Sequence, residues 1–488
     1  MPNQKALVAV DLGAQSCRVS LLRWGNACQA SIQVVRRFPN SPITSDHGLR
    51  WDIGKIFDGV VRGLRACASL APEGIASIAV DGWAVDYVRL SQHRQAQENP
   101  FCYRDRRSEA AEEKVHAILA PPRLYALTGT QILRINTLYQ LYADKLAGAD
   151  IHAPWLLLPE FITYRLGARP VAEYTNATHT GLVKLGTHHW CAEIFNELGL
   201  DLAAAPEIVS SGTIVGLLHG ELAQLPAFRE TKLIVAATHD TAAAIAAIPA
   251  DGDDWAFISS GTWSLVGTVL NSPCVSDAAR DLNFTNLGGT GGKICFLKNV
   301  NGMWLLGQCM DEWEQAGHPT AVPQLIAACA DLPAPAAVIN VDDPGLMLPG
   351  DALKKINAQL ARAGHPTFAL SSAEIPQIAN LVFHSLAARY AEVLSSIQQV
   401  TGKKLRRIFI VGGGSQNHHL NQLTAQSTGL QVLLGSTEST TIGNFAIQLA
   451  ARDGQWNPAT GVPVESVARY AAQLAAGSFA LSTGSETN

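Results

Sequence analysis

The sequence predicts an α/β protein with two similar halves, each of which begins with a strand, a glycine turn and a second strand. The first of these units occupies residues 6–24, "ALVAVDLGAQSCRVSLLRW", and the second occupies residues 253–270, "DDWAFISSGTWSLVGTVL". Between and after them, strand-like and helix-like segments alternate, which is typical of a mixed or parallel sheet covered by helices. The two units share a plan rather than a sequence, so we expect two domains of similar construction.

The remaining elements follow from local patterns. Residues 75–90, "IASIAVDGWAVDYVRL", are strand-like, residues 156–166 are helix-like, and residues 233–248 are a strand followed by an alanine-rich helix. Residues 372–402 predict a long amphipathic helix closed by Gly402. After it, residues 405–430 predict strand, three glycines and helix, and residues 431–451 predict strand, loop and helix.

Length and composition bound the class of protein. With 488 residues, 47% hydrophobic and 16% charged, the chain suits a globular protein of two or three domains. The acidic turn at residues 250–254 favours a division into 1–250 and 251–488, and the Ala/Pro-rich residues 317–337 are expected to be irregular. A net charge of −5 without a long basic run gives no sign of a nucleic-acid surface. The sequence has no apolar run long enough to cross a membrane.

The cysteine pattern and the first residues favour the cytoplasm. Nine cysteines are scattered without a C-x-x-C pair, which fits reduced thiols better than disulfides or structural zinc. The opening residues run directly into a strand pattern and do not have the form of a signal peptide. Fourteen histidines include "THHW" and "QNHHL" but no HExxH spacing, so a histidine metal site is disfavoured.

The two glycine turns, "DLGAQS" and "SSGTWS", are candidate phosphate sites. A turn without bulky side chains lets backbone N–H groups approach phosphate oxygens, although most such turns are plain hairpins. Asp11 ends an apolar run, where an unpaired buried carboxylate is costly. It either caps the turn or faces a site where it holds a water-bound Mg²⁺.

Three further segments leave two interpretations open each. Asp240, between an apolar strand and an alanine-rich helix, is either a helix cap or a general base. The glycines of "IVGGGSQN" either admit a nucleotide or make a tight turn, and the chain has no GxGxxG or Walker A sequence. The segments "VDGWAVDYVRL" and "YRDRRS" suit sugar recognition and surface ion pairs equally well. Their residues of interest are Trp83, Asp86, Arg104, Asp105 and Arg106.

Taken together, these segments resemble the FGGY carbohydrate kinases of the actin-like ATPase superfamily. The resemblance runs from about residue 7 to 451 and rests on motifs in a fixed order: "AVDLGAQSCRVSLL", "VDGWAVDYV", "YRDRRS", "INTLYQL", "EYTNATHTGL", "THDTAAA", "SSGTWSL", "LKNVNGMWLL", "VGGGSQNHHLNQLTA" and "TTIGNFAIQL". It implies two ribonuclease-H-like domains with sugar and ATP in the cleft between them. Residues 1–250 would form the N-terminal sugar-binding and catalytic domain, and residues 251–488 the nucleotide-binding domain with a C-terminal helical tail.

The resemblance also implies a role for particular residues. Asp240 would be the catalytic base, and Asp11 would lie at the Mg²⁺ ion. The sugar would be lined by Ala84, His239, Asp240, Thr241 and Asn299. The ATP would contact Ala14, Gln15, Ser16, Cys17, Arg18, Thr262, Gln308 and Gly413.

Three positions depart from the family pattern. Cys17 and Ala84 stand where relatives usually have glycine. Gly307 stands where a nucleotide-contacting glutamine is expected, with Gln308 one place later. We expect the Cys17 thiol to be exposed beside the nucleotide, where a thiol reagent would modify it unless MgATP protects it.

The function expected from the resemblance is ATP-dependent phosphorylation of a small sugar. "INTLYQL" and "SSGTWSLVG" favour L-rhamnulose, phosphorylated on its primary 1-hydroxyl, with Asp240 accepting the hydroxyl proton. The alternatives are a kinase for another ketose or polyol, such as L-fuculose, and a non-catalytic, sugar-responsive ATPase module. No nucleic-acid or membrane partner is expected.

Overall fold

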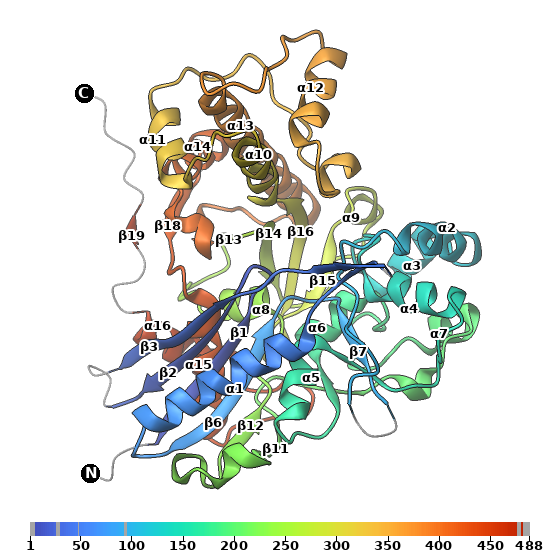
Figure 1. The fold of residues 1–488 in the computed structure, drawn as a ribbon, viewed down its shortest axis with the longest axis vertical. Coiled ribbons are helices and arrows are strands. Elements are labelled where there is room, and N and C mark those ends of the chain that lie inside the picture. The colour runs from blue at the N-terminus through green and yellow to red at the C-terminus, as the bar shows by residue number, and fades with distance from the viewer. Residues whose placement is uncertain (1–4, 26–29, 47, 92–94, 476–479, 482–488) are drawn as a thin grey trace. The chain divides into compact units, whose positions relative to one another are not determined.

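The computed structural model describes residues 5–25, 30–46, 48–91, 95–475 and 480–481. The chain forms two compact units (Figure 1). Unit 1 contains Met1–Pro249, Val269–Phe296 and Ser439–Ala476, and unit 2 contains Ala250–Thr268 and Leu297–Glu438 with the C-terminal strand β19 (Ala480–Leu481). The division into sugar-binding residues 1–250 and nucleotide-binding residues 251–488 stays a prediction. By contacts, Ser439–Ala476 lies with unit 1, because α15 (Ser439–Arg452) packs against its sheet.

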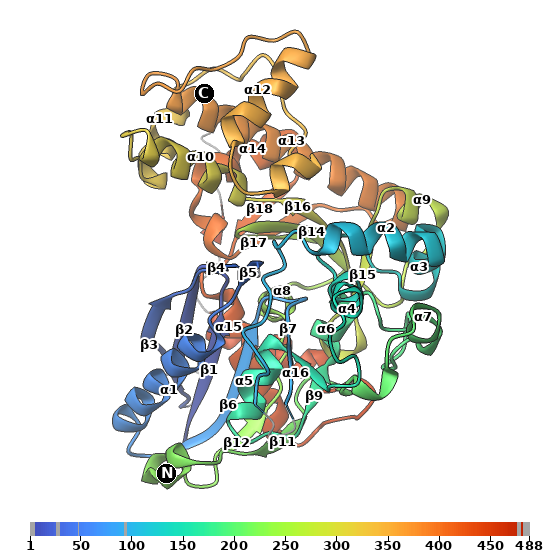
Figure 2. The ribbon, with the colours of Figure 1, turned by 45° about the vertical axis from the view of Figure 1, so that its right-hand side comes forward.

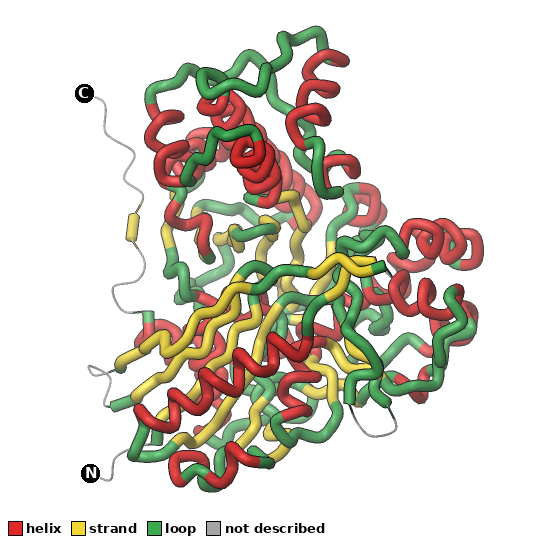
Figure 3. Tube along the Cα trace, in the orientation of Figure 1, coloured by secondary structure: helices red, strands yellow, loops and turns green. Residues whose placement is uncertain are grey.

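The sheet of unit 1 has six strands in the order β11-β12-β6-β1-β2-β3. Figure 3 shows the strands in yellow. β1 (Ala6–Leu12), β2 (Ser16–Arg23) and β3 (Ser31–Pro39) are antiparallel neighbours. β6 (Ile75–Gly82) and β12 (Lys232–Ile234) continue the sheet in parallel, and β11 (Ile214–Leu217) is antiparallel at the edge. Every residue of β1 is buried, which explains its nearly continuous apolar sequence.

Helices cover this sheet within unit 1. α1 (Ile53–Leu70), capped by the Asp52 side chain, packs on β2 and β3. α15 packs on β1 and β6 and also against α8 (Asp240–Ala246), with α16 (Val464–Leu474) beside it. Phe445 and Leu449 of α15 complete an apolar cluster with Leu7, Ala9 and Leu22 of the sheet. The C-terminal helices therefore form part of the core of unit 1.

A second region of unit 1 follows β6 in the chain (Figure 2). Its first helices are α2 (Ser108–Ile118), α3 (Pro121–Thr128) and α4 (Thr137–Leu146). β7 (Tyr87–Arg89) pairs with β8 (Trp155–Leu157), and β9 (Val171–Glu173) pairs with β10 (Glu207–Val209). α5 (Leu158–Arg165), α6 (Tyr174–Ala177) and α7 (Ala192–Leu198) complete it, around an apolar cluster that includes the tyrosines of α4.

The second sheet repeats the order of the first. Its middle runs β16-β14-β13-β17-β18, with β15 (Thr285–Gly288) and β19 at its edges. β13 (Trp255–Ser260) is antiparallel to β14 (Trp263–Leu270) and parallel to β17 (Arg407–Val411), and β17 is parallel to β18 (Gln431–Leu434). Among these five middle strands β16 (Ile294–Asn301) comes third in the chain, so their order is the one that β3, β2, β1, β6 and β12 have in unit 1. The predicted repeat of one ribonuclease-H-like plan in an α/β protein is confirmed.

The helices of unit 2 confirm one local prediction and correct another. α13 (Ile375–Thr401) is the predicted long helix, and it ends at Gly402 with a φ of 71°. α14 (His418–Thr428) follows the three glycines, and α10 (Trp304–Gln315) and α12 (Ala352–Arg362) lie earlier in the chain. The expectation that residues 317–337 are irregular is wrong, because they contain α11 (Val322–Ala330). Its proline lies in the first turn, where a missing N–H costs no helical hydrogen bond.

Two kinds of feature are absent from the part of the chain that the structure describes. None of the described helices is long and apolar enough to span a membrane. Among the same residues, no group of three or more His, Cys, Asp or Glu side chains is placed to hold a metal ion. The described cysteines are free thiols, and all of them except the partly exposed Cys274 are buried.

Candidate active site

Two aspartates stand side by side where neighbouring parallel strands of unit 1 end. Asp11 of β1 is in register with Asp81 of β6, and the exposed fractions of the two residues are 2% and 0%. Asp11 also stands opposite Arg18 of β2 and forms an ion pair with its guanidinium. The order of the three strands therefore assembles two buried carboxylates and one cation at one end of the sheet.

Asp81 was missed by the sequence reasoning, although it ends an apolar strand just as Asp11 does. Its Oδ2 accepts a hydrogen bond from the Asn444 side chain of α15, whereas its Oδ1 is buried without a hydrogen-bond partner. Gln448, one turn later on α15, donates to Asn444 Oδ1 at 2.8 Å and to the Val8 carbonyl at 3.0 Å. Burial, with the nearby charge of Asp11, holds the pKa of Asp81 well above its ordinary value.

Asp240, at the start of α8, interacts with charged groups of the same cluster. It is the first residue of the helix, whereas the N-cap position belongs to His239. Its electrostatic interactions include Asp81 and Arg18. Its Oδ1 accepts from the Thr241 hydroxyl at 3.1 Å, and one third of its side chain remains exposed. Burial raises the pKa of Asp240 to about 6, so it is ionised at neutral pH and close to titrating.

Backbone hydrogen bonds fix the segment that precedes Asp240. The Gly82 N–H at the end of β6 donates to the Thr238 carbonyl at 3.0 Å, and Gly82 forms a parallel bridge with His239. His239 is buried, and burial lowers its pKa to about 3, so its ring is neutral. Its ring lies 3.8 Å from the ring of His179, a second buried histidine that the sequence reasoning did not select.

The first glycine turn, residues 13–15, lies between β1 and β2. Asn40 holds it, because its backbone N–H donates to the Gln15 carbonyl and its side chain donates to the Gly13 carbonyl. Of the predicted phosphate residues, Ala14 and Ser16 are partly exposed and Gln15 is exposed. The turn therefore has open backbone and a fixed shape, as a phosphate site needs.

The prediction of an exposed, reactive thiol at Cys17 is wrong. Cys17 has no exposed surface and faces Phe38 across the pairing of β2 with β3. Burial raises the pKa of Cys17 to about 12, so the thiol stays protonated. The side chain is a small apolar group in the core.

The predicted sugar segment carries a strained residue. Val85, which follows Ala84, has a φ of 71°, a conformation that a β-branched residue rarely adopts. Its carbonyl accepts hydrogen bonds from Thr137 at 2.7 Å and from Gln140 at 3.3 Å, both on α4. The "INTLYQL" helix thus holds this backbone in place. Strain of this kind is concentrated at functional sites.

Three of the charged and aromatic residues around this segment form hydrogen bonds with other parts of the chain. Asp86 is fully buried and accepts hydrogen bonds from the indoles of Trp51 and Trp83 at 2.6 and 2.9 Å. Those two rings pack 4.5 Å apart. Asp105 accepts from the Leu49 N–H at 2.7 Å, which joins "YRDRRS" to β5 (Gly48–Arg50).

Unit 2 contains the other predicted nucleotide and sugar residues. The Thr262 carbonyl, in the second glycine turn, accepts from the Trp304 N–H at the start of α10. A Cβ at Gly414 would lie 1.9 Å from Ser260 Oγ, so the glycine segment packs directly on the end of β13. Gly413 is exposed, with open space where a side chain would be. Asn299 lies on β16, and Gln308 Oε1 accepts from the Gly350 N–H at 2.9 Å.

The carboxylates of unit 1 suit a hard divalent cation. Mg²⁺ prefers oxygen ligands and usually takes one or two carboxylates together with water. Asp11 and Asp81 provide such a pair, and the bare, buried Asp81 Oδ1 is an acceptor that a bound ion would satisfy. The chemistry of the residues therefore fits the ion predicted at Asp11.

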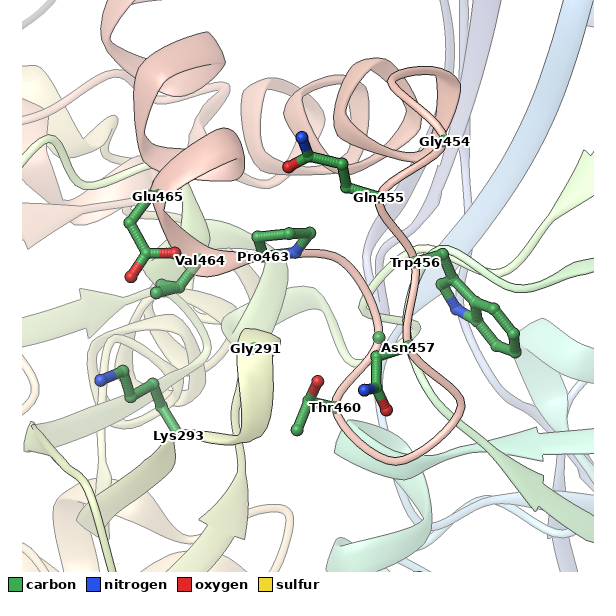
Figure 4. Close-up of a pocket in the computed structure, with 11 residues that line it drawn as sticks. Gly291, Lys293, Gly454, Gln455, Trp456, Asn457, Thr460, Pro463, Val464 and Glu465 are labelled. Atoms are coloured by element: carbon green, nitrogen blue, oxygen red, sulfur yellow. The ribbon is translucent and has the colours of Figure 1, made fainter.

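An open pocket of unit 1 contains none of the predicted residues. Its volume is about 380 Å³, and it lies between the loop that follows α15 and the start of α16 (Figure 4). Lys293, Trp456 and Glu465 are among its lining residues.

Comparison with known proteins shows extensive similarity. The models of the FGGY family of carbohydrate kinases match residues 6–247 with the N-terminal domain and residues 256–452 with the C-terminal domain. A rhamnulokinase of Oceanobacillus iheyensis is 33% identical over 92% of this chain and 94% of its own length. A rhamnulokinase of Bacteroides thetaiotaomicron is 34% identical over 90% of this chain and 89% of its own length.

Solved structures share the fold at low identity. The xylulose kinase of Lactobacillus acidophilus has a TM-score of 0.74 at 16% identity, and each chain is covered to 96%. The Plasmodium falciparum glycerol kinase with ADP has a TM-score of 0.71 at 13% identity, with 96% of this chain and 92% of that chain covered. These likenesses show that the chain shares the fold of these two kinases.

Proposed function

Because this chain belongs to the FGGY family of carbohydrate kinases, we propose that it transfers the γ-phosphoryl group of ATP to the 1-hydroxyl of L-rhamnulose. The products are L-rhamnulose 1-phosphate and ADP. The choice of sugar is supported by the two rhamnulokinases that align with nearly the whole chain. We further propose that the reaction takes place in the cytoplasm.

The observation that carries the mechanism is the position of Asp240. Its partly exposed carboxylate interacts electrostatically with Asp81 and Arg18. Its raised pKa suits a general base near neutral pH. As the O1 hydroxyl oxygen forms its bond to the γ-phosphorus, the bond from phosphorus to the β–γ bridging oxygen breaks. The hydroxyl proton passes to Asp240 Oδ, and ADP leaves with the electron pair of the broken bond.

Phosphoryl transfer asks a protein mainly for alignment and charge compensation. Asp11 and Asp81 would hold Mg²⁺, which when bound neutralises phosphate charge. Arg18 contributes a guanidinium beside the same carboxylates. The roles given by the family pattern are part of the proposal: the phosphates at residues 14–18 and Thr262, the nucleotide at Gln308 and Gly413, and the sugar at Ala84, His239, Thr241 and Asn299.

A panel of sugars in a coupled ADP-release assay tests this function. L-rhamnulose should give the highest kcat/KM, and the product should carry phosphate on O1. A higher kcat/KM for L-fuculose, D-xylulose or glycerol would overturn the choice of sugar and leave the kinase class intact. ADP release that does not depend on any sugar would contradict the kinase mechanism and favour an ATPase module.

A further inference from the structure

A second pair of buried carboxylates contacts the segment that carries Asp240. Glu160 of α5 and Glu173 at the end of β9 have exposed fractions of 2% and 0%. Both contact Thr238, two residues before Asp240. The Thr238 hydroxyl donates to Glu160 Oε1 at 2.6 Å, and the Thr238 N–H donates to Glu173 Oε2 at 3.0 Å.

Glu160 has the surroundings of an ionised carboxylate. Both of its oxygens accept from the Asn176 side-chain amide, at 3.3 and 3.0 Å. Its Oε1 also accepts the Glu173 N–H at 3.1 Å together with the Thr238 hydroxyl. Hydrogen bonds of this kind favour the charged form of a carboxyl group.

Glu173 is different, because only one of its oxygens has donors. Its Oε2 accepts from the Thr175 N–H at 3.0 Å, from the Thr175 hydroxyl at 2.5 Å and from the Thr238 N–H. Its Oε1 is buried without a partner, and so is Oδ1 of Asn176 in the same cluster. Two buried acceptors without a donor are costly, and one added hydrogen is the donor that this cluster lacks.

The charges around the pair do not compensate two anions. Among the residues that the structure describes, no Lys, Arg or His forms an ion pair with either glutamate. The titratable neighbours are Tyr174 and His239. Tyr174 follows Glu173 in the chain. The backbone N–H of His239 donates to the Thr175 hydroxyl at 3.4 Å, and its ring is neutral. Two uncompensated charges in one buried cluster are far more expensive than one.

We propose that Glu173 is a positioning residue that carries a proton on Oε1 at neutral pH, so that Glu160 and Glu173 share one negative charge and together hold Thr238, and through it His239 and Asp240, in place. A proton on Oε1 turns one of the two buried, unpartnered acceptors of this cluster into a donor. Burial, followed by the nearby charge of Glu160, raises the pKa of Glu173 to about 8. Burial also raises the pKa of Glu160.

The proposal gives the enzyme an alkaline limit. When pH rises through about 8, the Oε1 proton leaves to solvent and a second negative charge forms beside Thr238. The charged pair repels, and the segment that presents Asp240 loses its fixed position. We therefore expect kcat to fall to about half near that pH. The substitution Glu173→Gln mimics the protonated acid, because the glutamine NH2 group donates a hydrogen bond and its carbonyl oxygen accepts one.

The first test is a titration of the wild-type protein labelled with ¹³C at the glutamate side-chain carboxyl carbon. One glutamate resonance should titrate near pH 8, and Glu173→Gln should remove it while Glu207→Gln, an exposed control on β10, should leave it. The measurement uses no substrate, so it stands whether or not the proposed sugar is correct. If every glutamate carboxyl is ionised at pH 7, the proposal is overturned.

The second test compares two variants and rests on the proposed kinase activity. Glu173→Gln should keep kcat within about threefold at pH 7 and lose the alkaline decline near pH 8. Glu160→Gln should be much more damaging to Tm and to kcat, because its amide would direct hydrogens at groups that donate to Glu160 now. Equal damage from both variants, or an unchanged alkaline limb in Glu173→Gln, would overturn the assignment of the proton.

Discussion

Gly443 of α15 lies directly against the backbone of Ala243 in α8. A Cβ atom at position 443 would be 1.7 Å from the Ala243 carbonyl oxygen, which is far inside any van der Waals contact. The two helices can approach this closely only because residue 443 has no side chain. The contact matters for the candidate site, since α8 begins with Asp240 and α15 carries Asn444, the partner of Asp81.

The substitution Gly443→Ala should therefore destabilise unit 1. Forcing a methyl group into a packed helix contact costs about 1–3 kcal/mol, and here the clash is with backbone rather than with a flexible side chain. The expected result is a lower urea midpoint together with a reduced kcat, because α8 must move. Gly307→Ala is the matched control. That glycine lies within α10 with nothing near its missing side chain, so alanine should stabilise by about 0.5–1 kcal/mol.

Asp240→Asn separates catalysis from folding. The helix N-cap is His239, and asparagine at 240 keeps an oxygen that can accept from Thr241, so the variant should melt close to wild type. It cannot take a proton, so kcat should fall by roughly 10²–10⁴-fold while sugar and MgATP still bind. Calorimetric binding and the coupled assay check the two halves of this expectation. Turnover near that of wild type would remove Asp240 from the mechanism.

The raised pKa of Asp240 sets the acid limit of activity. A general base must be ionised, and its carboxylate becomes protonated as pH falls through about 6. Between pH 5 and 7.5, we expect kcat/KM to decrease as pH falls through about 6 and to level off about one pH unit above that value. Circular dichroism at each pH is the control for folding. A profile that stays flat down to pH 5 would show that the titrating base is another group.

Thiol labelling should leave Cys17 untouched in the native protein. The side chain is fully buried and its pKa is raised to about 12, so both access and the reactive thiolate are missing. Peptide mapping should find Cys17 unmodified with and without MgATP, and modified in urea. The partly exposed Cys274 should react first among the cysteines that the structure describes. Rapid modification of Cys17 in buffer would contradict this packing.

The sequence predicted features in which a local pattern decides the structure. β1 ends at Leu12, just after Asp11, because its apolar run ends there, and α13 ends at Gly402 because a residue with positive φ closes it. The repeat of strand, turn and strand predicted two domains of one plan, and both sheets have it. In the candidate site, Asp11, Arg18 and Asp240 were selected and are held by the structure in one group of interacting charges.

What the sequence did not predict depends on contacts between distant segments. Asp81 ends a strand just as Asp11 does, but only the register of β1 with β6 shows that the two carboxylates adjoin. The strain at Val85 depends on hydrogen bonds from α4, about fifty residues later in the chain. Glu160 and Glu173 look like ordinary charged residues of a helix and a strand end until burial is known. Cys17 was misjudged because the turn suggested exposure and the pairing with β3 was not visible.

The position of α15 also bears on how this chain is made. The ribosome synthesises β1, β6 and α8 long before α15 and α16, which complete the core of unit 1. Until then, Leu7 and Ala9 of the sheet lack the side chains of Phe445 and Leu449 that cover them. The nascent chain must therefore be synthesised beyond residue 449 before its first strands are covered on this side. A fragment that ends at residue 250 would expose the apolar face of the unit 1 sheet that α15 covers. The two halves of the chain are therefore not expected to fold independently.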